Sequence, residues 1–154
     1  MLIEEFFRIY FQEAADPMQA YYERLNLVGR EYPEKQRYVE EETWTPLILR
    51  ELAELLDQAR ESARQEVVQR RVRRECEALK AYQLAAQALA LFQQWKKEGT
   101  PQNLSEVRQA LTQAHTFLQQ IADEDIVAEA VFADALQRKI GRHLPHGEAR
   151  TATE

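Results

Sequence analysis

The chain of 154 residues and 18.1 kDa has the length of one domain. Its four Gly and five Pro, against many Ala, Leu, Glu, Gln and Arg, are the composition of a helical protein. The 26 acidic and 20 basic residues give a net charge of −6, which argues against nucleic acid as the main partner because binding to phosphates requires surplus cations.

The first 15 residues carry Glu4, Glu5, Arg8 and Glu13 among their apolar side chains. A signal peptide requires an uninterrupted apolar stretch of roughly 7–15 residues, and a membrane-spanning helix requires about 20. We find neither pattern in the sequence. We therefore expect no membrane partner and a cytoplasmic location for the chain as given, whereas a parent protein could be extracytoplasmic.

Apolar residues at helical spacing predict a first helix over residues 2–15. They form a stripe and its flank, Phe6, Tyr10 and Ala14 beside Phe7 and Phe11. Asp16 and Pro17 predict the boundary, with Asp16 as the N-cap and Pro17 as the first residue of a second helix over 17–30. The apolar side of this second helix comprises Met18, Tyr21, Tyr22, Leu25 and Val28.

A polar connector follows over residues 31–45, with a short helix expected around 34–41. Thr45 and Pro46 repeat the cap-then-proline signal and open a third helix. One helix from 46 to 97 would be about 78 Å long, which exceeds the size of a compact domain of this length. Because the apolar spacing weakens at 62–67, we expect a turn or sharp bend there.

The sequence Gly99-Thr100-Pro101 ends this region, and a further helix is predicted over 103–122. A last helix begins at the acidic residues 123–125 and ends at Ile140, with Gly141 as its C-cap. We expect one helical domain over 1–142 (aromatic-rich pair 1–30, connector 31–45, bundle 46–142) and a disordered tail over 143–154. The predicted fold is all-α, an antiparallel bundle of five or six helices.

Aromatic residues are concentrated near the amino end, where nine of the fourteen lie within the first 45 residues. Two short helices cannot hide so many large side chains from water by themselves. We therefore expect some of them to cover the end of the bundle or to meet a surface outside this chain. The expected contact residues are Phe7, Phe11, Tyr22, Tyr32 and Trp44.

The single Cys excludes an internal disulfide and a thiolate metal cluster. Cys76 has basic neighbours, which lower a thiol pKa and favour a nucleophile. However, no His lies near Cys76 in the sequence, and Cys packs readily as a small hydrophobic residue. A thiol in the core is therefore the favoured interpretation, and a helical enzyme that uses Cys76 is the alternative.

Residue spacing gives no support to metal, cofactor or glycosidase chemistry. The residues three before His115 and His143 are Thr112 and Ile140, so the Glu-x-x-His pattern of helical di-metal sites is absent. The acidic runs 40–42 and 123–125 favour solvated caps over paired catalytic carboxylates. The basic run 70–74 has acidic neighbours, which favours a solvated helix face with ion pairs at i,i+3 or i,i+4 to Glu66, Glu75 and Glu77.

The first two predicted helices contain Glu5-Phe6, Tyr10-Phe11-Gln12-Glu13-Ala14-Ala15-Asp16-Pro17-Met18, Tyr21-Tyr22 and Leu25, and the next two segments contain Leu55-Leu56-Asp57-Gln58-Ala59 and Arg71-Val72 with Leu79 and Tyr82. These residues resemble a segment of a large uncharacterised bacterial family of glycoside-hydrolase-like proteins, related to α-glucuronidases and hexosaminidases. In that family a Phe, a Tyr-Tyr-Gly-Pro-Ala-Ala stretch and a following aromatic residue begin the helical domain that follows a TIM-type barrel. Gln12 and Glu13 stand where the family has Gly-Pro.

This resemblance implies a helical accessory domain that packs against a catalytic barrel, and it assigns no catalytic residue to this chain. Our leading hypothesis is a non-catalytic accessory domain of a carbohydrate-active protein. The alternative is a free-standing helical module that binds a protein partner or forms a homodimer through the same aromatic residues.

Overall fold

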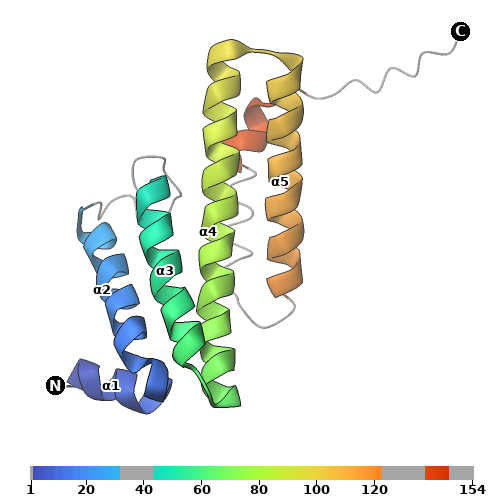
Figure 1. The fold of residues 1–154 in the computed structure, drawn as a ribbon. Helices are drawn as coiled ribbons and strands as arrows, with labels where there is room; N and C mark the ends of the chain where they lie inside the picture. Colours follow the sequence, from blue (N-terminus) through green and yellow to red (C-terminus); the bar gives the residue numbers. More distant parts are fainter. Residues whose placement is uncertain (1, 32–43, 123–137, 146–154) are drawn as a thin grey trace, which may run out of the picture.

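The computed structural model describes residues 2–31, 44–122 and 138–145, and within them the protein is all-α, as predicted. Helices α2 to α5 run alternately in opposite directions, and α1 lies across the end of the bundle where α2 begins and α3 ends (Figure 1). The elements are α1 (Leu2–Phe11), the 3₁₀ turn η1 (Gln12–Ala14), α2 (Ala15–Glu31), α3 (Pro46–Ser62), α4 (Glu66–Glu98), α5 (Pro101–Ala122) and the 3₁₀ turn η2 (Gly141–His143).

The first helix ends earlier than the sequence predicts. The chain turns at Gln12, whose φ of 46° lies in the left-handed region, and not at Asp16. Asp16 and Pro17 lie in the first turn of α2, where a missing backbone N–H costs no helical hydrogen bond. Pro17 thus correctly predicted that a helix starts here. The predicted N-cap, Asp16, was wrong by two residues, because α2 already begins at Ala15.

The break predicted at 62–67 is confirmed, because α3 ends at Ser62 and α4 begins at Glu66. No Gly or Pro makes this turn; Ala63 and Gln65 simply leave the helical region, with ψ of 111° and 138°. The predicted start of α3 is also confirmed. The Thr45 hydroxyl accepts a hydrogen bond of 3.3 Å from the backbone N–H of Ile48.

The turn at η1 is hydrogen-bonded to the turn between α3 and α4. One carboxylate oxygen of Glu13 accepts hydrogen bonds from the backbone N–H groups of Arg64 (2.6 Å) and Gln65 (2.9 Å). The Gln65 side-chain amide donates to the side-chain oxygen of Gln12. Glu13 thereby satisfies backbone donors just before α4, where such groups have no helical partner. This pairing fixes α1 across the end of the bundle.

The core has two main parts, and α4 contributes to both. Its first half packs with α1, α2 and α3, and its second half packs with α5 and Ile140. Because α4 has 33 residues, it is about 50 Å long and spans both parts. Trp44 packs against both parts, and its ring stacks on Tyr82 of α4 with centroids 4.6 Å apart.

The predicted end of α4 is confirmed. Gly99 adopts the left-handed conformation, with φ of 65°, and its N–H donates to the carbonyl of Trp95. At the carboxyl end, Ile140 is buried, and the chain continues from it into η2, which begins at the predicted C-cap Gly141. The disordered tail predicted over 143–154 is wrong for its first residues, because Leu144 packs on the second part of the core and the carbonyl of Pro145 accepts a hydrogen bond of 2.6 Å from Arg108. The rest of that tail lies outside the described residues. The expected helix at 34–41 lies outside the described residues.

Candidate functional site

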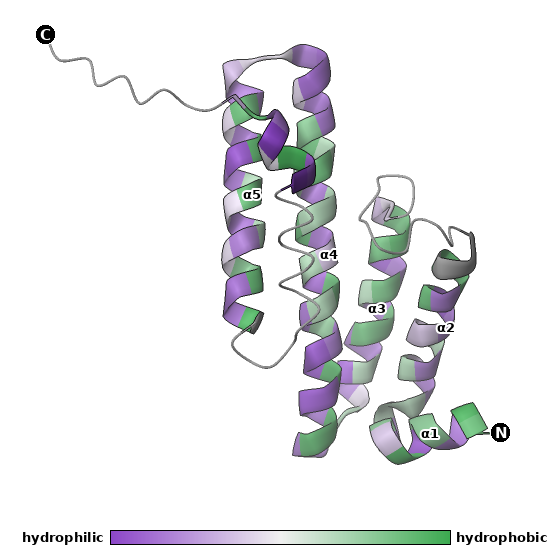
Figure 2. Ribbon diagram, turned by 180° about the vertical axis from the view of Figure 1, so that it is seen from behind, coloured by the Kyte–Doolittle hydropathy of each residue, from purple (hydrophilic) through white to green (hydrophobic). Residues whose placement is uncertain are grey.

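The outer face of α1 is the largest concentration of exposed apolar side chains on one helix among the described residues. Leu2, Ile3, Phe6 and Ile9 are exposed to 85%, 69%, 53% and 68%. We call these four residues the α1 outer face. The hydropathy colouring shows hydrophobic residues at the free end of α1, away from the bundle (Figure 2).

Helix α1 has apolar residues on two sides. Phe7 and Phe11, four residues apart, are 6% and 2% exposed and belong to the core. Phe6 lies 100° around the helix from Phe7, so it cannot share that face. Of the predicted stripe, Ala14 is buried and Tyr10 is half-buried, whereas Phe6 faces solvent. Periodicity alone could not decide between the two sides, because both are apolar.

Contacts with α4 fix which side of α1 faces inward. The Arg71 guanidinium lies 3.9 Å from the centroid of the Tyr10 ring and also donates a hydrogen bond to the Tyr10 carbonyl. That carbonyl lies in the last turn of α1, where backbone oxygens lack helical donors. Phe6 stacks on Tyr10 from the solvent side, with centroids 5.3 Å apart.

Four of the five predicted contact residues pack within the chain itself. Phe7 and Phe11 are buried, so a partner cannot reach them without a rearrangement of the core. Tyr22 is half-buried between α1 and α4, and Trp44 is half-buried against Tyr82. Tyr32 lies outside the described residues. The expectation that these rings need a surface from another protein does not hold for Phe7 and Phe11, since both lie in the core and contact Tyr22 of α2.

A hydrogen-bonded tyrosine–carboxylate pair lies between α2 and α4. The Tyr22 hydroxyl donates a hydrogen bond of 2.7 Å to Glu75. Burial raises the pKa of the Glu75 carboxyl above its ordinary value, and the bond from Tyr22 offsets part of that rise. Burial likewise raises the pKa of Tyr22, and the Glu75 contact adds to it. Because Tyr22 and Glu75 lie 53 positions apart in the sequence, their hydrogen bond connects α2 to α4.

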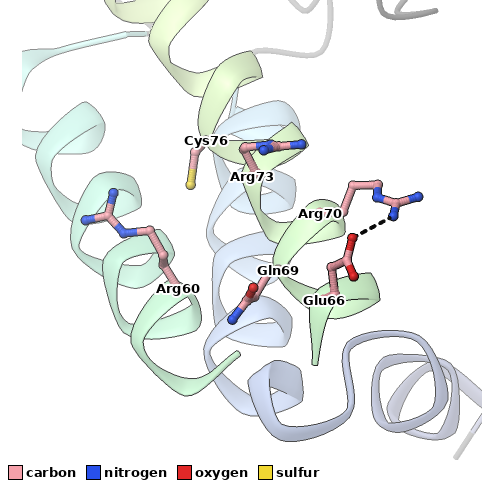
Figure 3. A pocket seen from close by; sticks show the side chains of 6 residues that line it. All are labelled: Arg60, Glu66, Gln69, Arg70, Arg73 and Cys76. Carbon is pink, nitrogen blue, oxygen red and sulfur yellow. Dashed lines mark hydrogen bonds and ion pairs between the residues drawn. The ribbon is translucent and has the colours of Figure 1, made fainter. Parts of the chain in front are cut away.

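An open pocket of about 420 Å³ lies between α3 and α4, with Cys76 in its wall (Figure 3). Burial raises the pKa of the half-buried Cys76 thiol, although the charge of Arg60 acts in the opposite direction. The thiol is therefore protonated at neutral pH, the opposite of what an activated nucleophile needs. The remaining lining residues are Arg60, Glu66, Gln69, Arg70 and Arg73.

The arginines of this pocket are largely engaged with acidic neighbours. Arg70 pairs with Glu66 at 3.4 Å, which confirms one i,i+4 pair of the basic run, and Arg60 pairs with Asp57 at 3.0 Å. These pairs are exposed and weak. Figure 3 shows the Arg70 guanidinium turned toward Glu66 and away from the Cys76 sulfur. Nothing in this arrangement directs several positive charges at one bound anion.

Metal sites and membrane spans are absent from the part of the chain that the structure describes. No three His, Cys, Asp or Glu side chains gather there in a way that could hold a metal ion. His115 is exposed on α5, and His143 lies in η2 with its ring 6.0 Å from Phe92. Every helix in the same residues falls short of the length and apolar content needed to cross a membrane.

Comparison with models of protein families, with curated proteins and with solved structures finds no match to this chain.

Proposed function

We propose that this chain is a non-catalytic helical module that binds another protein surface through the α1 outer face. One observation carries the proposal: four large apolar side chains are more than half exposed on a single helix whose other side is anchored in the core. At on the order of 150 Å² for a large side chain, they expose about 400 Å² of apolar surface. Patches of this size on a protein are often functional.

The position of α1 suits this role. Helix α1 is held by Arg71 and by the Glu13 hydrogen bonds, so it does not need a partner to keep its place. A binding surface on a fixed helix loses little conformational freedom when it binds. The polar groups in the pocket beside Cys76 offer no comparable argument, because the thiol is neutral and two of the three arginines, Arg60 and Arg70, are paired with acidic neighbours.

The resemblance to the glycoside-hydrolase-like family supports one form of this proposal, in which the partner is a catalytic barrel and this chain is its accessory domain. In that form, the α1 outer face replaces Phe7 and Phe11 as the contact surface. The chain alone is then expected to leave aryl glycosides unhydrolysed. Measurable turnover by the purified chain would refute a non-catalytic role.

Photo-crosslinking in the native cells tests the binding role. A benzophenone side chain at position 6 is expected to give a discrete adduct with one protein. The matched control carries the same group at Gln113, which is exposed on α5, and is expected to give none. Absence of any adduct at position 6, or equal adducts at both positions, contradicts the proposal.

A further inference from the structure

We infer that the occupant of the α1 outer face is a second copy of this chain, paired antiparallel across a two-fold axis near Phe6. This inference rests on the proposed function and names its partner. Leu2, Phe6 and Ile9 are spaced by four and three residues, so they form one narrow stripe along α1. Four- and three-residue spacing is the spacing with which two helices pack against each other.

The flanks of this stripe differ in character. At 100° per residue, Glu5 and Arg8 lie on the same flank, one residue before Phe6 and Ile9 respectively. Ile3 lies on the other flank. Glu5 and Arg8 are both exposed, and neither has an ion-pair partner within the residues described. One flank is therefore charged with both signs, and the other is apolar.

Antiparallel pairing matches these flanks, and parallel pairing does not. In a two-fold antiparallel pair the same flanks face each other in reverse order, so Glu5 of one copy meets Arg8 of the other, twice. Ile3 then faces the apolar flank of the partner. In a parallel pair each charged flank would face the partner's apolar flank, which leaves Glu5 and Arg8 without opposite charges.

The placement of α1 leaves room for a second molecule. Helix α1 lies across one end of the bundle, and its amino end extends beyond α2 (Figure 1). Two copies can therefore meet end to end. The exposed apolar side chains of both copies would bury about 800 Å² together, and the charged flanks would add to this area. A buried area of this size is typical of weak interfaces. We expect a dissociation constant on the order of 100 micromolar.

Sedimentation equilibrium over a concentration range up to about 1 mM tests the inference, because it spans the expected dissociation constant. The full chain is expected to show a monomer–dimer equilibrium, and Phe6→Glu is expected to weaken it at least about tenfold by placing charge at the centre. Leu47→Glu is the matched control, since Leu47 is 60% exposed and lies in the first turn of α3. That end of α3 lies away from α1 (Figure 1). Leu47→Glu is expected to leave the equilibrium unchanged.

Charge exchange tests the antiparallel register. Glu5→Arg and Arg8→Glu are each expected to weaken dimerisation by bringing like charges together, and the double variant is expected to restore it. Circular dichroism checks that each variant folds. A chain that stays monomeric at every concentration, or a dimer in which the double variant is as weak as each single variant, overturns the inference.

The experiments distinguish a failure of the self-pairing inference from a failure of the proposed binding role. If the chain stays monomeric but position 6 crosslinks to a different protein, self-pairing is refuted and the binding role stands. If position 6 gives no adduct at all, the binding role itself is refuted.

Discussion

The Glu13 carboxylate accepts a hydrogen bond of 2.6 Å from the backbone N–H of Arg64, 51 residues away in the sequence. It accepts a second from Gln65, so one side chain joins the turn after α1 to the turn before α4. These bonds favour the charged carboxylate and lower its pKa, the Gln65 N–H most strongly.

Replacement of Glu13 is expected to make stability less dependent on pH. A lowered pKa in the folded state stabilises the fold above the ordinary value of 4.5, and this contribution is lost as the pH falls through the folded pKa. Glu13→Gln should therefore lower the melting temperature at pH 7 and cause little difference in strong acid. Thermal unfolding across the acid range measures this. Glu54→Gln, on an exposed part of α3, is the control and should change little at any pH.

Replacement of Glu75 is expected to change stability at pH 7 in the opposite direction from replacement of Glu13. Its pKa is raised by burial, so the folded state is favoured below the ordinary value of 4.5 and loses stability as the pH rises through the folded pKa. Glu75→Gln keeps an acceptor for Tyr22 without the charge, and should be more stable than the wild type at pH 7 but equal to it in strong acid. Urea unfolding at several pH values checks this. A variant that is less stable at pH 7 would contradict the burial argument.

The hydrogen bond from Tyr22 to Glu75 can be tested in the same way. Tyr22→Phe removes the donor and leaves a half-buried carboxylate without its 2.7 Å partner. The expected cost is about 1–3 kcal/mol in the free energy of unfolding at pH 7. The cost should largely disappear when Glu75→Gln is already present, because an amide is less costly to leave unpaired. Equal costs in both backgrounds would show that the pair contributes nothing beyond packing.

Substitutions by Gly and Val at Gln12 are expected to affect stability in the opposite order from the same substitutions inside a helix. Its φ of 46° is accessible to Gly but strained for a β-branched residue. Gln12→Gly is expected to leave stability within about 0.5 kcal/mol, whereas Gln12→Val should cost about 2 kcal/mol. At Gln113, inside α5, the order should reverse, since Gly is the poorer helix former. The same order at both positions would contradict the left-handed turn.

The two sides of α1 should differ in their contribution to stability. Phe11 is 2% exposed, so Phe11→Ala should cost about 3–5 kcal/mol. Phe6 is more than half exposed, and Phe6→Ala should cost about 1 kcal/mol or less. Chemical denaturation of both variants measures the difference. Similar costs would mean that Phe6 belongs to the core, which would remove the observation behind the binding proposal.

Local signals in the sequence determined the helices and most of their ends. The caps at Thr45 and Gly99 and the break near Ala63 are confirmed, because hydrogen bonds within a few residues decide them. The apolar periodicity also identified Met18, Tyr21 and Val28 as core residues. These predictions depend only on neighbours in the chain.

Only the tertiary structure decided how α1 is used. Two of its sides are apolar, so the choice of Phe7 over Phe6 as the buried ring depends on Tyr22 and Arg71, which come from other helices. The position of the first turn likewise depends on Glu13 meeting a backbone 51 residues away. No pattern within a helical window contains such partners, because packing joins residues that are distant in the sequence. The candidate site is the surface that remains after that packing is complete.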